Sequence, residues 1–310
     1  MARSHPEQTI AVVVTYNRKA LLVECLNALL AQSHPCSILI VDNASTDGTK
    51  DTVHAWKNDP KTLACQKSRN LQIVYHRLDE NIGGAGGFCE GLRQAVLMGY
   101  SCVWGMDDDA IPGPDALAAL LAFGKAHPDF GFLASKVLWK DGSYCRMNEP
   151  KFIEGKQSDE MDRPIRQASF VSFFLRAQVI EAIGLPLKDF FIWGDDVEYT
   201  RRISASYPCW YVPESVVIHK CADNVGSDIS RASHDRLDRY RYAYRNEVYI
   251  ARQEGFSRKL YQMAKICLHT ARVLLHAPDH KKERLAIIWS ASKSGLHFSP
   301  RKETVNDPRT

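Results

Sequence analysis

The sequence lacks any long apolar run, any paired cysteine motif and any low-complexity segment. No apolar stretch approaches the roughly 18 residues that a membrane-spanning helix needs, so we expect a chain that does not cross a bilayer. The amino-terminal stretch MARSHPEQTI has no apolar core of the kind found in a signal peptide. The nine cysteines are odd in number and scattered. They predict reduced thiols in a cytoplasmic protein and disfavour a disulfide framework or a zinc site.

The remaining composition is that of an ordinary globular protein, with 310 residues, 45% of them hydrophobic and 25% charged. Such a chain suits one large domain with appendages, or two domains. The formal net charge of +4 is unevenly spread. Residues 255–310 contain eleven Lys or Arg and four acids, a net charge of +7, which leaves −3 for the rest of the chain. The basic charge is therefore a feature of the C-terminal part.

Short β-branched runs alternate with helical patterns across about the first 110 residues. Strands are predicted at TIAVVV (9–14), SILIVD (37–42), LQIVYHR (71–77) and YSCVWGM (100–106). The alternation predicts an α/β fold with βαβ units and a mostly parallel sheet. Ligands bind such sheets at the carboxyl ends of the strands. The polar residues at these predicted ends are Thr15, Asn17, Arg18, Asp42, Asn81 and the triplet 107–109.

The later part of the chain is more mixed. RQASFVSFFLRAQVIEAIG (166–184) predicts a strand followed by a helix, and CWYVPESVVIH (209–219) predicts a strand that ends at His219. Beyond about Asp235 the pattern is helical.

A glycine-rich stretch, NIGGAGGF (81–88), precedes a predicted helix. One interpretation is a place where backbone N–H groups approach an anion; the other is a loop that needs positive φ angles. It contains no Walker lysine and follows the third predicted strand. A dinucleotide-binding fingerprint would follow the first strand, so that function is disfavoured.

Three consecutive acids follow a predicted buried strand in WGMDDDA (104–110). Against a low-dielectric core such carboxylates are costly unless a cation is present. Asp107 and Asp109 have DxD spacing, so either could reach a hard divalent cation that also binds diphosphate oxygens. The alternative is an acidic turn, or a helix N-cap before IPGPDALAAL (111–120).

A second acidic pair, Asp195 and Asp196, follows bulky aromatics in FFIWGDDVEYTRRI (190–203). We expect a helix that begins near Asp195, with its carboxylates at the favourable N-terminal end. The pair is either a general base aimed at an acceptor hydroxyl, or a helix cap. His219 is likewise either a metal ligand or a structural histidine.

Six segments occur in a fixed order between about residues 8 and 225: VVVTYNR, ILIVDNASTDGT, NIGGAGGF, DDD, FFIWGDDVEYTRR and VIH. As an ordered set they resemble the family 2 glycosyltransferases, whose GT-A fold has a Rossmann-like, mostly parallel central sheet flanked by helices. NIGGAGGF, WGMDDD and GDDVEY are most similar to bacterial galactofuranosyltransferases of the type that initiates galactan. YAYRN (242–246) also resembles a segment of those enzymes, and rhamnosyltransferases share much of the pattern.

The resemblance implies an inverting, metal-dependent glycosyltransferase of cell-surface polysaccharide synthesis. The implied donor is a nucleotide-sugar, with UDP-galactofuranose favoured and dTDP-rhamnose as the alternative. The implied acceptor is a glycan or a polyprenyl-diphosphate-linked saccharide. The implied site residues are Thr15, Arg18, Asp42, Asn81 and Asp107 for the nucleotide; Asp107, Asp109 and His219 for Mn²⁺ or Mg²⁺; Asp108, Trp193 and Gly84 for the sugars; and Asp196, with Asp195, for catalysis.

The same resemblance predicts how the chain is divided. Residues 1–230 would form the GT-A domain, with a nucleotide-binding part at about 8–125 and an acceptor-binding part at about 126–230. Residues 231–310 would form a helical, basic extension.

Two stretches of this extension, 263–277 and 284–296, combine apolar faces with Lys and Arg. They predict helices that either lie on an anionic membrane, such as the cytoplasmic face of the inner membrane, or pack on their own domain. Nucleic acid is not an expected partner, because no aromatic platform or binding motif accompanies the charge.

Two other classes of protein share some of these features. A nucleotidyltransferase is disfavoured because the first predicted strand ends in TYNRKA, without glycines. A degenerate, membrane-associated scaffold would have lost the metal or base carboxylates, and all of them are present.

Overall fold

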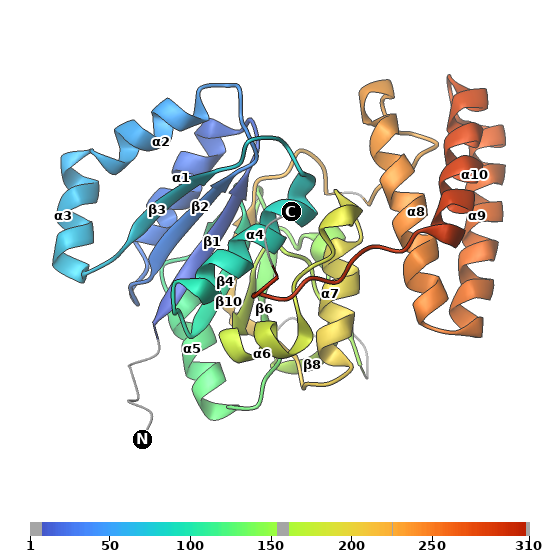
Figure 1. The fold of residues 1–310 in the computed structure, drawn as a ribbon. Coiled ribbons are helices and arrows are strands. Elements are labelled where there is room, and N and C mark those ends of the chain that lie inside the picture. Colours follow the sequence, from blue (N-terminus) through green and yellow to red (C-terminus); the bar gives the residue numbers. More distant parts are fainter. Residues whose placement is uncertain (1–7, 154–160, 225, 308–310) are drawn as a thin grey trace.

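A ten-stranded sheet forms the centre of the described residues, which are 8–153, 161–224 and 226–307 of the computed structural model (Figure 1). Residues 1–7, which form most of the stretch examined for a signal peptide, lie outside them. The strand order is β3-β2-β1-β4-β9-β6-β10-β8-β7, with β5 beside β10. The strands are β1 (Thr9–Thr15), β2 (Ser37–Asp42), β3 (Ile73–Arg77), β4 (Cys102–Asp107), β5 (Ala110–Pro112), β6 (Phe132–Trp139), β7 (Lys151–Phe152), β8 (Arg163–Gln167), β9 (Phe173–Arg176) and β10 (Trp210–His219).

Helices flank the sheet on both faces and continue beyond it. They are α1 (Lys19–Leu30), α2 (Thr49–Lys57), α3 (Pro60–Arg69), α4 (Gly83–Leu97), α5 (Ala116–Ala126), α6 (Ala177–Ile183), α7 (Asp195–Ser204), α8 (Leu237–Gln253), α9 (Phe256–His276) and α10 (Lys281–His297). Short 3₁₀ turns are η1 (Arg146–Asn148), η2 (Lys188–Phe190) and η3 (His234–Arg236).

The predicted α/β architecture is confirmed. The four strands expected in the first 110 residues are β1 to β4, and they pair in parallel. The later half adds antiparallel pairing, because β9 lies antiparallel between β4 and β6. The sheet is therefore mixed, with a parallel half that carries the predicted polar strand ends on one edge.

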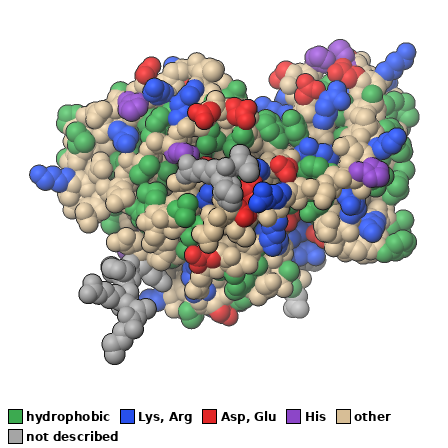
Figure 2. All heavy atoms as spheres, viewed as in Figure 1, with side chains coloured by type: hydrophobic (Ala, Val, Ile, Leu, Met, Phe, Trp, Pro, Cys, Tyr) green, Lys and Arg blue, Asp and Glu red, His purple; other side chains and the backbone are tan. Residues whose placement is uncertain are grey.

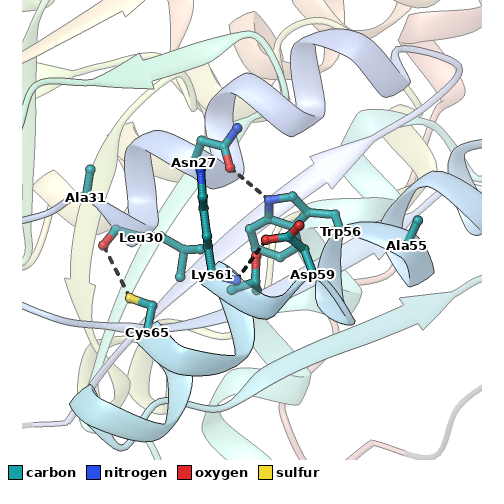
Figure 3. Close-up of a pocket in the computed structure, with 9 residues that line it drawn as sticks. Asn27, Leu30, Ala31, Ala55, Trp56, Asp59, Lys61 and Cys65 are labelled. Atoms are coloured by element: carbon teal, nitrogen blue, oxygen red, sulfur yellow. Dashed lines mark hydrogen bonds between the residues drawn. The ribbon is translucent and has the colours of Figure 1, made fainter.

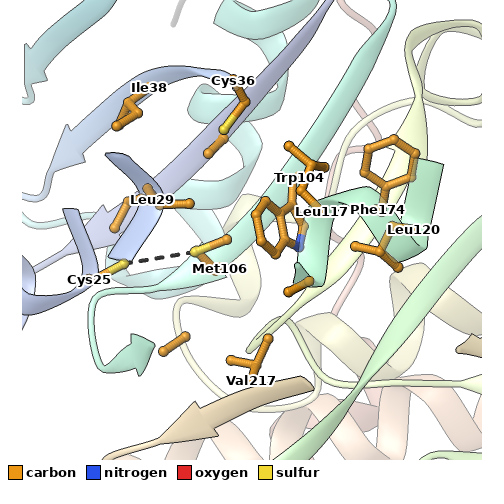
Figure 4. Close-up of a cluster of buried hydrophobic side chains, with 14 of the residues drawn as sticks. Cys25, Leu29, Cys36, Ile38, Trp104, Met106, Leu117, Leu120, Phe174 and Val217 are labelled. Carbon is orange, nitrogen blue, oxygen red and sulfur yellow. Dashed lines mark hydrogen bonds between the residues drawn. The ribbon is translucent and has the colours of Figure 1, made fainter. Parts of the chain in front are cut away.

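Two apolar clusters cover the two faces of the sheet. In β1, Ala11 and Val13 join one cluster, whereas Ile10 and Val12 join the other. Figure 4 shows part of the first cluster, where Trp104 of β4 lies near Leu117 of α5. Burial on both faces explains why TIAVVV is a continuous apolar run without alternation.

The C-terminal helices α8, α9 and α10 stand beside the sheet domain and share an apolar cluster of their own (Figure 1). Ile287 and Ile288 of α10 are fully buried in that cluster. The predicted helical pattern beyond Asp235 is confirmed as far as His297. The division of the chain near residue 230 stays a prediction.

Residues 303–307 return from these helices to the sheet domain (Figure 1). Val305 is buried in the cluster that includes Leu92 of α4. The guanidinium group of Arg93, also buried, pairs with Glu303 and donates hydrogen bonds to the carbonyl oxygens of Thr304 (2.7 Å) and Val305 (3.1 Å). This last described segment therefore belongs to the apolar core on one face of the sheet.

Candidate active site

The parallel strands align polar side chains in a row at their carboxyl edge. Thr15 of β1 pairs in register with Asp42 of β2, and Asp42 pairs with Arg77 of β3. On the other side of β1, Val14 pairs with Asp107 of β4. The register thus brings together residues that are up to 93 positions apart in the sequence. Arg77 belongs to this row although the sequence pattern did not single it out.

Asp42 is fully buried in this row, and neighbouring groups already contact its carboxylate. The Tyr75 hydroxyl donates to one oxygen at 2.5 Å, and the Ser45 backbone N–H donates to the other at 2.9 Å. Arg77 lies 3.9 Å away. Burial, followed by the contact with Asp42, raises the pKa of Tyr75 beyond its ordinary value. The carboxylate is therefore held rigidly, with a phenol and a guanidinium group beside it.

The acid triplet lies in the turn between β4 and β5. Asp108 and Asp109 are almost completely buried, and Asp107 is partly exposed. Asp108 accepts a hydrogen bond from the Thr15 hydroxyl at 2.7 Å, and Arg18 reaches Asp109 at 2.6 Å and Asp108 at 3.4 Å. Because β5 separates the triplet from α5, the helix N-cap explanation is wrong. Arg18, whose side chain is about half exposed, therefore bridges the carboxylates of Asp108 and Asp109.

The pairing of β5 with β10 places His219 beside the triplet. His219 is opposite Ala110 in the antiparallel register, and the Lys220 N–H donates to the Asp109 carbonyl oxygen at 2.8 Å. The imidazole Nε2 of His219 lies 3.1 Å from Oδ1 of Asp109. The predicted partner of the triplet therefore comes from a strand that is more than 100 residues away in the sequence.

Asp107, Asp109 and His219 fit a divalent cation. One ligand atom from each lies within 4.8 Å of the others. The buried Oδ1 of Asp109 has the His219 imidazole, 3.1 Å away, as its one close polar neighbour among the described residues, so a lone pair of this oxygen remains for a cation. Two carboxylates and an imidazole suit Mn²⁺, and Mg²⁺ also accepts the carboxylates. The donor set therefore agrees with the cation expected from the DxD spacing.

The three carboxyl groups of the triplet have pKa values that shift in different directions. Burial, and then repulsion from Asp109, raises the pKa of Asp107 to about 7. Burial also raises the pKa of Asp108 to about 6, although Arg18 opposes the shift. For Asp109, His219 and Arg18 outweigh burial and lower the pKa. Asp107 and Asp108 therefore bind a proton more readily than an ordinary aspartate, whereas Asp109 binds it less readily.

The second acidic pair begins α7, as predicted. Asp195 is buried and Asp196 partly so, and the N-cap position is occupied by Gly194, in a left-handed conformation. The N-cap residue is therefore neither acid, although Oδ1 of Asp196 accepts a hydrogen bond from the Val197 N–H in the first turn, at 2.7 Å. Burial raises the pKa of Asp196 to about 6. Burial, then Asp196 and more distantly Asp107, raises the pKa of Asp195 well above its ordinary value. The influence of Asp107 indicates that this acid of the triplet lies near enough to Asp195 to repel it.

The loop before α7 is strained and is held by α8. Phe191 and Trp193 both have positive φ angles, 63° and 64°, which bulky residues adopt only at an energetic cost. The side-chain amide of Asn246, completely buried in α8, donates to the carbonyl oxygens of Phe190 (3.0 Å), Ile192 (3.3 Å) and Trp193 (2.8 Å). The segment YAYRN, which ends at Asn246, therefore supports the loop that carries Trp193 and the acids.

The glycine-rich stretch meets the same loop from the other side. The helix α4 begins at Gly83, so most of these glycines lie in its first turns and not in a loop. Gly83 has a φ of 76°, and a Cβ there would lie 2.0 Å from the Phe191 carbonyl oxygen. Asn81 caps this turn by accepting from the Gly83 N–H at 2.9 Å. Gly84, in contrast, faces open space. Close backbone contact explains Gly83, and the open side of Gly84 leaves room for a ligand.

A separate hollow of about 630 Å³ lies between α1, α2 and α3 (Figure 3). Asn27, Leu30 and Ala31 line it from the last turn of α1 and the residue that follows, which is the end of this helix farthest from the carboxyl edge. The Trp56 indole N–H donates to the Asn27 side chain at 2.9 Å. No predicted site residue lines this hollow. We therefore place the candidate active site at the acidic edge.

These contacts place every predicted site residue at the carboxyl edge or on the loop and helix ends beside it. Sequence patterns did not single out Arg77, Asn148 or the individual role of Asn246, which act through neighbours distant in the sequence. The only sequence signal for any of them was the YAYRN resemblance. The functional roles assigned to the predicted residues stay predictions.

The fold and the acidic edge define a glycosyltransferase of the GT-A type. A profile of Glycosyl transferase family 2 matches residues 10–184. More than half of the chain is matched, and the protein belongs to this family.

Named relatives agree with this class. Galactofuranosyltransferase GlfT1 of Mycolicibacterium smegmatis is 25% identical over 287 residues, covering 84% of this chain and 88% of the relative. GlfT1 of Mycobacterium tuberculosis is 27% identical, covering 83% and 86%. An N-acetylglucosaminyl-diphospho-decaprenol L-rhamnosyltransferase of M. tuberculosis is 25% identical, covering 70% and 77%. The chain is thus related to both galactofuranosyl- and rhamnosyltransferases.

Solved structures share the fold at low identity. A mannosyltransferase from Pyrobaculum calidifontis, in complex with GDP-Man and Mn²⁺, has a TM-score of 0.55 at 17% identity, covering 96% of this chain and 77% of that one. GalNAc-T7, solved with UDP, GalNAc and Mn²⁺, has a TM-score of 0.62 at 13% identity, covering 94% and 56%. The likeness shows the GT-A fold.

Proposed function

We propose that this glycosyltransferase transfers galactofuranose from UDP-galactofuranose, with inversion and with the help of a divalent cation. The observation that carries the proposal is the convergence of two acidic groups with different surroundings on one sheet edge. Asp107 and Asp109 lie beside Arg18 and His219, whereas Asp195 and Asp196 begin a helix behind an aromatic loop. The first group suits a diphosphate with its cation, and the second suits an acceptor hydroxyl.

The donor would occupy the row at the ends of β1 to β4. Asp42 would accept a hydrogen bond from the uracil, with Thr15, Arg18 and Asn81 positioning the base and ribose. Arg18 forms ion pairs with Asp108 and Asp109. A bound donor would therefore compete with Asp108 and Asp109 for the guanidinium group of Arg18, or share it with them.

Asp107, Asp109 and His219 would hold Mn²⁺ or Mg²⁺. A cation bound there would neutralise the charge that develops on the departing nucleoside diphosphate. Asp108, which turns toward Thr15, would lie near the donor sugar.

Asp196 would take the proton of the acceptor hydroxyl as that oxygen attacks the anomeric carbon. A single displacement with one base inverts the anomeric configuration. Partial burial keeps the Asp196 carboxylate weakly solvated and raises its pKa toward the working pH, which improves a general base. Asp195 and Trp193 would orient the acceptor, and Gly84 leaves space for the sugars.

The donor identity rests on the names of the relatives. Two species' GlfT1 proteins, called galactofuranosyltransferases, align over more than four-fifths of this chain. The rhamnosyltransferase relative supports the alternative, dTDP-rhamnose, and its name places its acceptor on diphospho-decaprenol. A polyprenyl-diphosphate-linked saccharide is accordingly the acceptor class that we favour.

A donor panel tests this function. Purified protein would be given UDP-galactofuranose, UDP-galactopyranose, UDP-glucose or dTDP-rhamnose, each with Mn²⁺, Mg²⁺ or EDTA, and nucleotide binding and release would be measured. We expect cation-dependent UDP release from the furanose only. Preference for dTDP-rhamnose would overturn the sugar and keep the mechanism, and equal rates with EDTA would overturn the cation.

A lipid-linked acceptor makes the exposed surface of α9 relevant. Of the described helices, none is both long and apolar enough to cross a membrane. The α9 apolar face consists of large hydrophobic side chains that are more than half exposed: Phe256, Leu260, Tyr261, Met263, Leu268, Leu274 and Leu275. Phe256, Leu260 and Met263 are four and three residues apart. Tyr261, Leu268 and Leu275 are each seven apart, so these side chains share one broad side of the helix. An apolar face of this length needs an apolar partner.

The charge of α9 favours an anionic bilayer as that partner. The helix carries Arg258, Lys259, Lys265 and Arg272 and no acidic residue. Two of these cations have acidic partners outside the helix, because Arg258 pairs with Glu254 and Lys265 with Glu247. Figure 2 shows basic and hydrophobic side chains next to one another over the C-terminal helices. A basic amphipathic helix of this kind lies in the plane of a membrane surface. We extend the proposal to peripheral contact through α9, whereas the apolar face expected of α10 is largely buried against α8.

Vesicle co-sedimentation tests the α9 contact. We expect binding to vesicles with anionic phosphatidylglycerol, weaker binding to pure phosphatidylcholine, and a large loss with Leu260→Glu. The matched control is Leu63→Glu, because Leu63 on α3 is similarly exposed, at 47% against 63%. Equal binding by both variants would overturn the contact. A concentration-dependent dimer that Leu260→Glu abolishes, without vesicle binding, would assign the face to a second copy.

A further inference from the structure

Behind His219, on the side away from the acid triplet, lies a buried asparagine. Asn148 ends the turn η1, and its Oδ1 is 2.8 Å from Nδ1 of His219. The same oxygen accepts from the Cys145 thiol at 3.0 Å. Its Nδ2 donates to the Ser169 hydroxyl at 2.9 Å. Each polar atom of the amide therefore has a partner, and the carbonyl oxygen faces the imidazole ring.

This arrangement determines which ring nitrogen carries a proton. A carbonyl oxygen only accepts hydrogen bonds, so Nδ1 of His219 must be the donor. A neutral imidazole with its proton on Nδ1 has its lone pair on Nε2. In this structure Nε2 is the atom that faces Asp109, at 3.1 Å. Nε2 of the protonated ring directs its N–H at Asp109, whereas in the neutral ring with the proton on Nδ1 the Nε2 lone pair would point into the group formed by Asp107, Asp109 and His219.

We propose that Asn148 is a positioning residue for the cation site: it holds the Nδ1 proton of His219 so that Nε2 is free to coordinate. The inference rests on the proposed function, because it assumes that the acid triplet holds a divalent cation. Asn148 itself does not touch that cation. Hydrogen bonds of this kind fix the orientation of a metal-binding histidine and strengthen it as a ligand.

The opposite orientation of the amide would have the opposite effect. If Nδ2 faced the ring, it would donate to Nδ1, and the proton of the neutral ring would move to Nε2. That N–H would then point at the carboxylates and exclude a cation from this nitrogen. The Cys145 sulfur lies 3.0 Å from this carbonyl oxygen and 3.9 Å from Nδ1 of His219, and the closer contact favours the proposed orientation, because a thiol can donate to the oxygen but not to the amide nitrogen.

The test compares the Mn²⁺ affinity of variants substituted at Asn148. Binding is measured in a titration in which electron paramagnetic resonance reports the concentration of free Mn²⁺. Asn148→Leu has a similar size and no acceptor, and we expect Mn²⁺ affinity to fall by about 10- to 100-fold. Asn148→Asp keeps an acceptor toward Nδ1 and should restore most of the affinity. UDP binding in EDTA and the thermal unfolding midpoint should be similar in both variants. Ser169→Ala, which leaves the ring contact in place, is the matched control.

A second readout does not depend on a variant that folds. In unsubstituted, Mg²⁺-loaded protein, ¹⁵N resonances of the His219 ring should show a protonated Nδ1 and a proton-free Nε2. A proton on Nε2, or equal Mn²⁺ affinity of the unsubstituted protein and Asn148→Leu, would overturn the role of Asn148 alone. Absence of Mn²⁺ binding by the unsubstituted protein would overturn the proposed cation site and this inference together.

Discussion

The two acidic groups of the candidate site differ in what surrounds them. Asp108 and Asp109 contact the guanidinium group of Arg18, and Asp109 also lies beside His219. Asp195 has a second carboxylate as its nearest charge, and burial is the largest influence on both Asp195 and Asp196. The pKa of Asp109 is lowered, whereas those of Asp195 and Asp196 are raised.

The difference teaches that carboxylates with similar sequence contexts are suited to different chemistry by their neighbours. Acids that already sit among cationic groups stay ionised and can share a dication. Acids that are mainly desolvated hold protons more readily, which suits proton transfer. DDD (107–109) and GDD (194–196) are similar sequences, and the neighbouring residues in the fold give their carboxyl groups different pKa shifts.

The largest expected effect comes from Asp196→Asn. Removing the proposed base should lower turnover by about 10²- to 10⁴-fold, while nucleotide and Mn²⁺ affinity stay unchanged, as measured by steady-state kinetics and titration. Glu198→Gln is the control in the same helix, since Glu198 pairs with Arg202. A comparable loss of turnover in Glu198→Gln, or unchanged turnover in Asp196→Asn, would contradict the assignment of Asp196 as the base and with it the contrast between the two acidic groups.

A smaller effect is expected from Asp109→Asn. The amide weakens cation binding, so Mn²⁺ affinity should fall at least about tenfold, and high Mn²⁺ concentrations should restore part of the turnover. Mn²⁺ dependence of the rate would be measured for this variant and for Asp196→Asn. If added Mn²⁺ rescued Asp196→Asn instead, the two assignments would have to be exchanged.

The smallest effect is a pH dependence. Because burial raises the pKa of Asp196 to about 6, the base is protonated below that pH, and kcat/KM should fall tenfold per unit there. The stability effect has the opposite sign. With a folded-state pKa above the unfolded one, the folded chain binds the proton more tightly, so this carboxyl loses stabilising effect as pH rises through 4 to 6. Asp196→Asn should therefore gain thermal stability relative to the unsubstituted protein as pH rises from 4 to 7, and a constant difference would contradict this.

Local patterns predicted the parallel half of the fold well. TIAVVV and SILIVD are buried on both faces, so their composition alone indicates strands. The triplet Asp107–Asp109 was recognisable because three acids after an apolar run need an explanation. The order of the family motifs carried the remaining site residues, from Thr15 to His219.

Other features depend on pairing that local patterns do not encode. The antiparallel position of β9 is set by its two neighbours, β4 and β6. The Asn246 side chain contacts Trp193, 53 residues away, and the Asn148 side chain contacts His219, 71 residues away. Local sequence patterns do not predict these distant contacts. Gly83 was expected in a loop and instead begins α4. Its φ is positive, as one interpretation predicted, and the distant Phe191 carbonyl oxygen leaves no room there for a side chain.

The return of residues 303–307 to α4 bears on the order of events during synthesis. Arg93 is buried, and its guanidinium group is satisfied by the Glu303 carboxylate and by backbone carbonyls of this late segment. Before that segment is synthesised, the guanidinium group of Arg93 has only Glu90, 3.5 Å away in the same helix, as a counter-charge, and the apolar site of Val305 is open. The sheet that is made first is therefore completed last, and it reaches its final stability only after translation has passed the C-terminal helices.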